Sequence, residues 1–127
     1  MHVLVVDDDP QVQSLYRYYL EREGFEVSVG GDGEQALDLL ASSHFDLAIL
    51  DLLLPRLHGL KVLARLRESE QPDSRAAVIV VTGVLMREPY RQEAMRLGAD
   101  AFFTKPVDMD ELVAAARRLV ARRAVAS

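Results

Sequence analysis

The chain has 127 residues, of which 50% are hydrophobic and 28% charged, and its twenty acidic and fifteen basic side chains give a formal net charge of −5. This length and composition fit one globular domain, and they argue against a disordered chain, a collagen-like chain and a basic nucleic-acid-binding domain. Because the chain contains no cysteine, disulfides, thiol catalysis and the usual cysteine-containing zinc sites are excluded.

The first apolar run predicts a buried strand over residues 3–6. It has no basic flank and is followed at once by acidic residues, so it is too short to be a signal peptide. The other long apolar region, residues 45–60, is interrupted by charged residues and by Pro55, whereas a membrane span needs about 20 predominantly apolar residues. We therefore expect a cytoplasmic protein without membrane insertion.

Four more aliphatic runs follow, and segments of helical period separate them. The runs lie at residues 27–29, 47–50, 78–81 and 101–103, and their nearly continuous apolar character predicts strands covered on both faces. Between and after the runs, apolar residues recur every three or four positions, as in one-sided helices. This alternation predicts an α/β fold with right-handed crossovers. We expect a single domain over residues 1–127, with a doubly wound, flavodoxin-like parallel sheet of five strands in the order 2-1-3-4-5.

Local signals agree with these boundaries. Asp9 before Pro10 is a good helix start, because Asp accepts from the first free amides and Pro has none to satisfy. Gly24 can take the left-handed conformation that ends a helix. Patterns similar to capping boxes occur at Asp32 with Gln35 and at Asp108 with Glu111.

Polar residues occur at the ends of four predicted strands. They are Asp7, Asp8 and Asp9 at the first strand, Asp51 at the third, Thr82 at the fourth, and Lys105 with Pro106 shortly after the fifth. With the order 2-1-3-4-5, the carboxyl ends of the first, third and fourth strands are neighbours, so at least three carboxylates share one depression. Crowded carboxylates stay ionised only beside a compensating cation, and Mg²⁺ (or Mn²⁺) prefers such oxygen ligands.

A site of this kind suits Mg²⁺-assisted phosphoryl transfer. Thr82 and Lys105 would supply a hydrogen-bond donor and positive charge for the phosphoryl oxygens, and Gly83 leaves its amide open to close approach. A carboxylate can act as the nucleophile, and Asp51 is the best acceptor because it faces both Asp8 and the Thr82 and Lys105 pair. Each of these residues alone could be an ordinary loop, core or surface residue, but their joint placement favours a site.

Four motifs in this order resemble the receiver domain of bacterial two-component response regulators. They are VVDDDP at residues 5–10, DLAILDLLLP at residues 46–55 followed by Gly59, VTG at residues 81–83, and KP at residues 105–106. The resemblance runs from end to end of the chain. It implies that Asp7 and Asp8 hold Mg²⁺, that Asp51 is both a metal ligand and the phosphoacceptor, and that the backbone carbonyl of Leu53 is a further ligand.

The resemblance also implies roles for the residues opposite the acids. Thr82 would bind a phosphoryl oxygen, Lys105 would pair with the phosphoryl group, and Phe102 aligns with the aromatic switch that turns inward when Thr82 moves. The bond before Pro106 is expected to be cis. His58, where an acid or amide is common, Gly83, where Ala is usual, and Phe102, which lacks a hydroxyl, depart from the family pattern.

The function implied is a signalling switch and not an enzyme with a separate substrate. A sensor histidine kinase or a phosphotransfer protein would donate the phosphoryl group to Asp51. The output would be a change of the face formed by the fourth helix, the fifth strand and the fifth helix, which would bind a partner or a second copy. No direct contact with nucleic acid is expected.

Two alternatives stay open at this point. Asp7 and Asp9 form a D-x-D at the end of the first strand, as in phosphatases of the haloacid dehalogenase type, with Thr82 and Lys105 as later motifs. In that reading Asp51 has no role, and the chain is short for such a phosphatase. The other alternative is a receiver-like scaffold that is never phosphorylated, although such a scaffold would not need the full set of polar residues.

Overall fold

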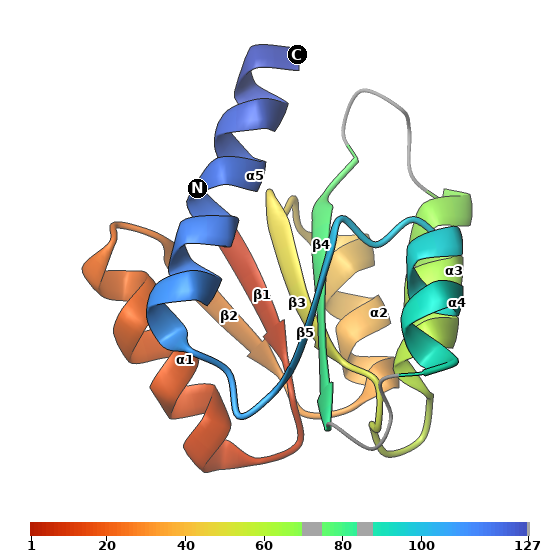
Figure 1. The fold of residues 1–127 in the computed structure, drawn as a ribbon. Helices are drawn as coiled ribbons and strands as arrows, with labels where there is room; N and C mark the ends of the chain where they lie inside the picture. The colour runs from red at the N-terminus through yellow and green to blue at the C-terminus, as the bar shows by residue number, and fades with distance from the viewer. Residues whose placement is uncertain (70–74, 84–87, 127) are drawn as a thin grey trace.

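Five strands alternate with five helices along the chain (Figure 1), in a computed structural model that describes residues 1–69, 75–83 and 88–126. The strands are β1 (His2–Val6), β2 (Glu26–Gly30), β3 (Leu47–Asp51), β4 (Ala77–Gly83) and β5 (Ala101–Lys105). The helices are α1 (Pro10–Arg22), α2 (Gly33–Ser42), α3 (Gly59–Ser69), α4 (Tyr90–Arg96) and α5 (Met109–Ala126). Among the helices described, none is long and apolar enough to cross a membrane.

The strands form one parallel sheet in the order β2-β1-β3-β4-β5. The strand order therefore changes direction between β1 and β3, which confirms the predicted doubly wound topology. The register pairs Val6 with Leu50, so Asp7 follows β1 directly beside Asp51, the last residue of β3. Towards the β5 edge of the sheet, Gly83 of β4 pairs with Lys105 of β5.

The predicted strands are each a little shorter than the observed ones. The difference that matters for the site is in β5, which was expected to end at residue 103 but continues to Lys105. The reason is that Thr104 and Lys105 still pair with Thr82 and Gly83 of β4, so the ladder extends past the apolar run. Lys105 is thus held within a strand and does not follow it in a loop.

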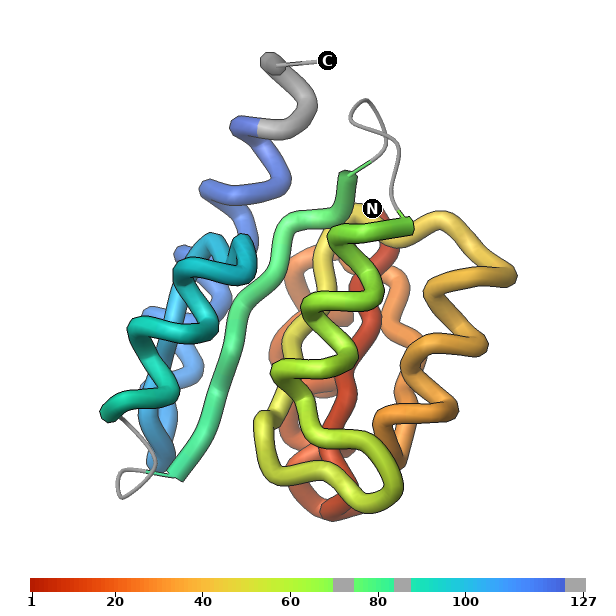
Figure 2. Tube along the Cα trace, turned by 90° about the vertical axis from the view of Figure 1, so that its right-hand side faces the viewer, coloured from red at the N-terminus to blue at the C-terminus, as the bar shows by residue number. Residues whose placement is uncertain are grey.

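The helices divide between the two faces of the sheet. α1 and α5 cover one face, and α2, α3 and α4 lie side by side on the other (Figures 1 and 2). Alternate strand residues enter the two cores, since successive side chains in a strand point to opposite faces. Phe103 packs on the α1 and α5 side, and Phe102 packs on the side of α2, α3 and α4, as the alternation predicts.

The helix ends follow most of the local signals. The side chain of Asp9 accepts from the backbone N–H of Gln11 at 2.9 Å, with Pro10 as the first helical residue of α1. Gly24 lies at φ +90° just after α1, a conformation that favours glycine. Both signals are confirmed.

The two predicted capping boxes form only partly. Asp32 accepts from the N–H of Gln35 at 2.8 Å, but the Gln35 side chain accepts from the N–H of Gly31 and not from Asp32. Asp108 accepts from the N–H of Glu111 at 3.2 Å. In both cases the acidic residue caps its helix as expected.

Candidate phosphoacceptor site

Strand alternation sorts the polar residues at the carboxyl ends of the strands onto two sides. Asp7, Asp51 and Lys105 lie two positions after Val5, Ile49 and Phe103, which enter the core under α1 and α5. Thr82 has the parity of Val80, which packs under α2, α3 and α4. The site is therefore approached from both sides of the sheet edge, with acids and lysine on one side and the threonine on the other.

Lys105 bridges the two buried acids. Its Nζ donates to Oδ2 of Asp51 at 2.9 Å and to Oδ2 of Asp7 at 3.0 Å. Asp7 and Asp51 are only 2% and 8% exposed, whereas Asp8 is exposed. One ammonium group thus faces two buried carboxylates, and a net negative charge remains.

Opposing effects set the proton affinities of this pair. Burial raises the pKa of Asp51 above the ordinary 3.8, the hydrogen bonds from Lys105 and from the Leu53 N–H lower it, and the charge of Asp7 raises it further. Burial lowers the pKa of Lys105, but the hydrogen bonds and charges of Asp51 and Asp7 outweigh burial and raise it above its usual value. Lys105 therefore stays protonated and positively charged beside any negative group at the site.

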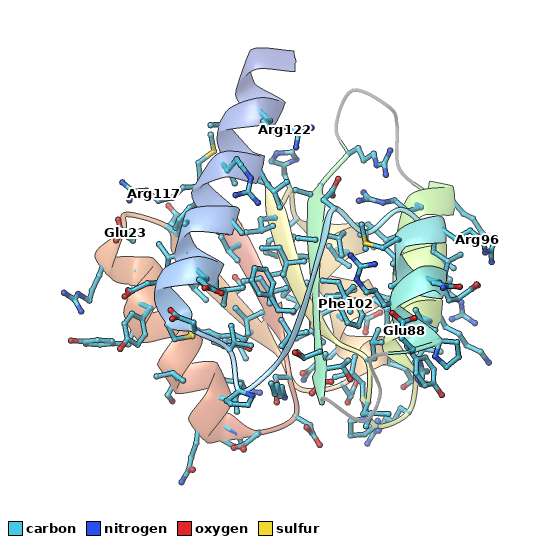
Figure 3. The ribbon with its side chains drawn as sticks, in the orientation of Figure 1. Glu23, Glu88, Arg96, Phe102, Arg117 and Arg122 are labelled. Atoms are coloured by element: carbon cyan, nitrogen blue, oxygen red, sulfur yellow. The ribbon has the colours of Figure 1, made fainter. Side chains whose placement is uncertain are left out.

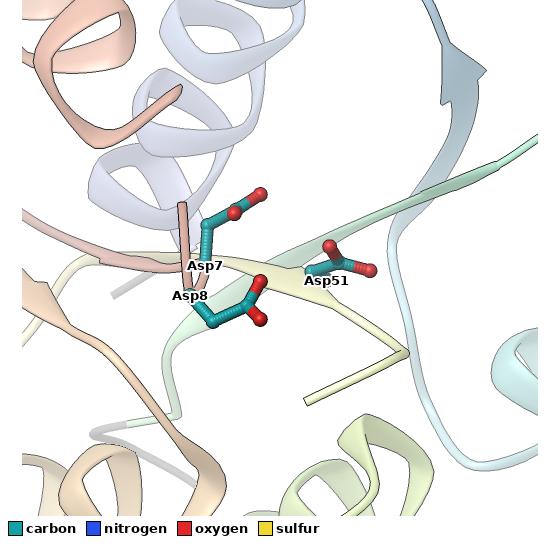
Figure 4. Close-up of side chains that lie close together, drawn as sticks. All are labelled: Asp7, Asp8 and Asp51. Carbon is teal, nitrogen blue, oxygen red and sulfur yellow. The ribbon is translucent and has the colours of Figure 1, made fainter. Parts of the chain in front are cut away.

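Three carboxylates are close enough to share a cation. One oxygen each from Asp7, Asp8 and Asp51 lie within 4.8 Å of one another, and Figure 4 shows the three side chains converging from β1 and β3. An oxygen-only donor set of this kind fits a hard divalent cation such as Mg²⁺ and does not fit a softer metal. The predicted fourth ligand, the backbone carbonyl of Leu53, stays a prediction; its N–H donates to Oδ1 of Asp51 at 3.1 Å.

Thr82 carries a buried hydroxyl without a hydrogen-bond partner among the described residues. The residue is fully buried, and leaving a hydroxyl unpaired costs free energy of about 1–3 kcal/mol. Next to it, a Cβ at Gly83 would meet no atom of the described residues within 4 Å, so those residues leave the backbone there open to approach. Both features suit an anion with free acceptor oxygens at this end of the sheet.

Phe102 lies on β5, two residues before Thr104, the residue that pairs with Thr82. Thr82 pairs with Thr104, and Phe102 pairs with Val80, on the same side of the sheet. Phe102 is partly buried and packs against the core beneath α2, α3 and α4 (Figure 3). The aromatic ring is thus on the side where Thr82 points, and its role as a switch stays a prediction.

Two residues near the site come from α1, where the motifs gave no signal. The Gln13 side chain donates to the backbone carbonyl of Asp7 at 2.6 Å. Tyr16 is buried, with 4% of its surface exposed. Burial raises the pKa of Tyr16 to about 12, the charge of Lys105 opposes the rise, and the charges of Asp7 and Asp51 add to it. The pKa of the Tyr16 hydroxyl therefore depends on the charges of the site.

His58, a departure from the family pattern, has a structural role. Its Nδ1 accepts from the backbone N–H of Leu60 at 3.1 Å, which caps α3 in the way an acid or amide would. Its ring also stacks on Tyr90 at the start of α4, with ring centroids 5.7 Å apart. The residue therefore links the loop after Asp51 to α4.

Comparison with known proteins agrees with this arrangement. The family model described as the response regulator receiver domain matches residues 3–117. The chain belongs to this family. Receiver domains are the signalling domains of two-component response regulators, and the resemblance stated from the motifs is confirmed.

Relatives and solved structures extend the match over nearly the whole receiver domain. The transcriptional regulatory protein CpxR of Escherichia coli (strain K12) is 42% identical over 120 residues, which cover 94% of this chain and 49% of CpxR. The chain thus spans about half the length of the curated relatives it matches. A CheY-like receiver domain protein from Methanospirillum hungatei superposes with a TM-score of 0.91 at 26% identity, covering 99% of this chain and 98% of that one.

A second solved structure is a complex with Mg²⁺-BeF. The response regulator protein TrrA from Thermotoga maritima, in complex with Mg²⁺-BeF, superposes with a TM-score of 0.81 at 31% identity. The match covers 93% of this chain and 97% of TrrA. The fold that holds Asp7, Asp8 and Asp51 together here is therefore shared with a protein that binds Mg²⁺.

Proposed function

We propose that this receiver domain is a phosphorylation switch, in which Asp51 accepts a phosphoryl group from a phosphohistidine of a sensor kinase or phosphotransfer protein. The single observation that carries the proposal is the position of Asp51. One of its carboxylate oxygens lies within 4.8 Å of carboxylate oxygens of Asp7 and Asp8, and its Oδ2 accepts a hydrogen bond from the Lys105 ammonium at 2.9 Å. The domain would comprise residues 1–127, and a cytoplasmic location stays a prediction from the sequence.

The transfer step follows from these groups. An Asp51 oxygen forms a bond to phosphorus while the bond between phosphorus and the imidazole nitrogen breaks, and the imidazole leaves with that electron pair. Mg²⁺ (or Mn²⁺), held by Asp7, Asp8, Asp51 and the Leu53 carbonyl, would neutralise charge on the phosphoryl oxygens. Lys105 would move its hydrogen bonds from the acids to a phosphoryl oxygen.

Thr82 would carry the change to the surface. Its hydroxyl, which has no partner among residues 1–69, 75–83 and 88–126, would donate to a phosphoryl oxygen, with the Gly83 amide as a second donor. That new bond stabilises the arrangement with Thr82 drawn towards Asp51, and Phe102 would follow it inward. The face formed by α4, β5 and α5 would then change its affinity for an output partner or for a second copy. CpxR is described as a transcriptional regulatory protein, which supports an output of this kind.

The phosphatase alternative has no support here. Its D-x-D reading needs Asp9 as a free acid, but the Asp9 carboxylate caps α1 by accepting from Gln11. It also leaves Asp51, the central acid of the site, without a role.

Intact-protein mass spectrometry tests the proposal. After treatment with acetyl phosphate and Mg²⁺, we expect a gain of about 80 Da, the mass of one phosphoryl group. The gain should vanish in Asp51→Asn and persist in Asp38→Asn, a matched change on α2 away from the site. An unmodified wild-type protein, or a modified Asp51→Asn, would refute the phosphoacceptor role and favour the scaffold alternative.

A further inference from the structure

Gln13 connects α1 to the loop that carries the acids. Its side-chain Nε2 donates to the backbone carbonyl of Asp7 at 2.6 Å, and its backbone N–H donates to the carbonyl of Asp9 at 3.0 Å. The two bonds hold opposite ends of the acidic segment of residues 7–9. Only the second bond belongs to the regular start of a helix, so the first is a separate contact made by the side chain.

Asp8 depends on its backbone for its position. It is exposed, and within the described residues its side chain makes no hydrogen bond or ion pair. By contrast, Asp7 is buried and bound to Lys105, and Asp51 is bound to Lys105 and to the N–H of Leu53. Among these three acids, Asp8 is therefore the one whose side-chain direction depends on contacts made by the backbone around it.

The two peptide groups that flank Asp8 are both held. The peptide before it is held through the Asp7 carbonyl, which accepts from Gln13. The peptide after it is held through the Asp9 N–H, which donates to Oδ1 of Asp7 at 2.9 Å. Because these two planes define the backbone dihedrals of Asp8, they also fix where its side chain leaves the loop.

We propose that Gln13 is a positioning residue that orients Asp8 towards the divalent cation of the site. The inference rests on the proposed function, since it assigns Gln13 to the metal site of that function. An amide side chain suits the role. It offers N–H donors to the carbonyl without adding a positive charge that would compete with the cation. A carboxylate at the same place would repel the carbonyl, and an apolar side chain would leave it unpaired.

Mg²⁺ titration followed by two-dimensional amide NMR tests the inference without relying on activity. Gln13→Met keeps the length of the side chain but removes the donor, and Gln11→Met is the matched control on the exposed side of the same helix. We expect the Kd for Mg²⁺ to rise about two- to tenfold in Gln13→Met, the range of one hydrogen bond, and to stay unchanged in Gln11→Met. At saturating Mg²⁺, the rate of phosphorylation by acetyl phosphate should return to that of the wild type.

A second variant separates the lost donor from a change of charge. Gln13→Glu also removes the donor, but it adds a negative charge that attracts the cation, so its Kd for Mg²⁺ should rise less than that of Gln13→Met. Equal Kd values for Gln13→Met and the wild type would overturn the inference while leaving the proposed function intact. A wild-type protein that binds no Mg²⁺ would remove both.

Discussion

At the scale of single residues, Thr82 is a position where the residue type lowers stability but suits the site. Its buried hydroxyl has no hydrogen-bond partner in the part of the chain that the structure describes, which is unfavourable by about 1–3 kcal/mol, and a valine of the same shape would avoid this cost. The hydroxyl is understandable if an anion with free acceptor oxygens occupies the site in another state of the protein. Removal of the Thr82 hydroxyl should therefore not lower the free energy of unfolding but should weaken the response to phosphorylation.

We expect Thr82→Val to leave the free energy of unfolding of the unphosphorylated protein unchanged or to raise it by up to about 1 kcal/mol, because no hydrogen bond is lost. In the same variant, the amide NMR shifts that acetyl phosphate induces on α4 and β5 should shrink. Urea unfolding measures the first effect, and Thr104→Val, at the paired position of β5, is the control. A loss of more than 1 kcal/mol in Thr82→Val would mean that the hydroxyl already has a partner.

The acids and the lysine could be predicted from the sequence, but the residues of α1 could not. Asp7, Asp51 and Lys105 meet because parallel strands in a fixed order bring their carboxyl ends to one edge, a relation that the apolar runs reveal. Gln13 and Tyr16 share one helix face, yet whether that face meets the acidic loop depends on how α1 packs, which spacing alone does not give.

At the scale of elements, the start of α3 is closely fitted to the end of β3. The N–H of Gly59 donates to the carbonyl of Leu52 at 2.9 Å, and a Cβ on Gly59 would lie 2.4 Å from the carbonyl oxygen of Asp51. Only glycine allows this approach. The loop after Asp51 therefore comes back to the end of β3 within a few residues, and His58 lies directly before the first residue of α3.

The His58 cap predicts a pH-dependent stability. Burial and the charge of Lys61 lower the pKa of His58 below the ordinary 6.5, with Asp51 opposing, so the native state favours the neutral ring. The unfolded chain then binds more protons, and stability falls as the pH falls. The contribution is complete above 6.5, the unfolded value, and is lost as the pH falls through the folded pKa.

We expect the wild type in metal-free buffer to lose a few tenths to about 1 kcal/mol more between pH 7 and pH 5 than His58→Asn, because Asn can cap α3 at any pH in this range. Urea unfolding at each pH measures the difference, and ring-proton NMR gives the pKa directly. A His58 pKa at or above the ordinary value, or identical pH profiles for the two proteins, would show that the ring does not act as a neutral cap.

The elements themselves show where sequence patterns are sufficient. The five strands stand out because their apolar runs are nearly continuous, and Asp9 and Gly24 mark the ends of α1 correctly. The short α4 was less predictable. It begins after Pro89 without a side-chain cap among the described residues, and the apolar Met95 within it is 39% exposed. A helix of 7 residues, about two turns, is too short for its spacing to tell the buried side from the exposed side.

At the scale of the whole molecule, Lys105 connects the edge of the sheet to its centre. From the edge strand β5 it reaches past β4 to Asp51 on β3 and to Asp7 after β1. The Lys105 ammonium thus offsets part of the negative charge of the acidic site, and a net negative charge remains. Removing this charge leaves two buried carboxylates facing each other, so stability and metal binding should become linked.

We expect Lys105→Met to lower the free energy of unfolding by about 1–3 kcal/mol in metal-free buffer, less than a fully buried pair would lose, because the lysine side chain is 33% exposed. Lys61→Met, at the other lysine of the chain and exposed on α3, should cost almost nothing. Adding Mg²⁺ should stabilise Lys105→Met more than the wild type, because the more negative site binds the cation more tightly and binding raises stability by mass action. Urea unfolding with and without Mg²⁺ measures both effects. Equal losses in the two lysine variants would show that the acids of this site do not need Lys105 for compensation.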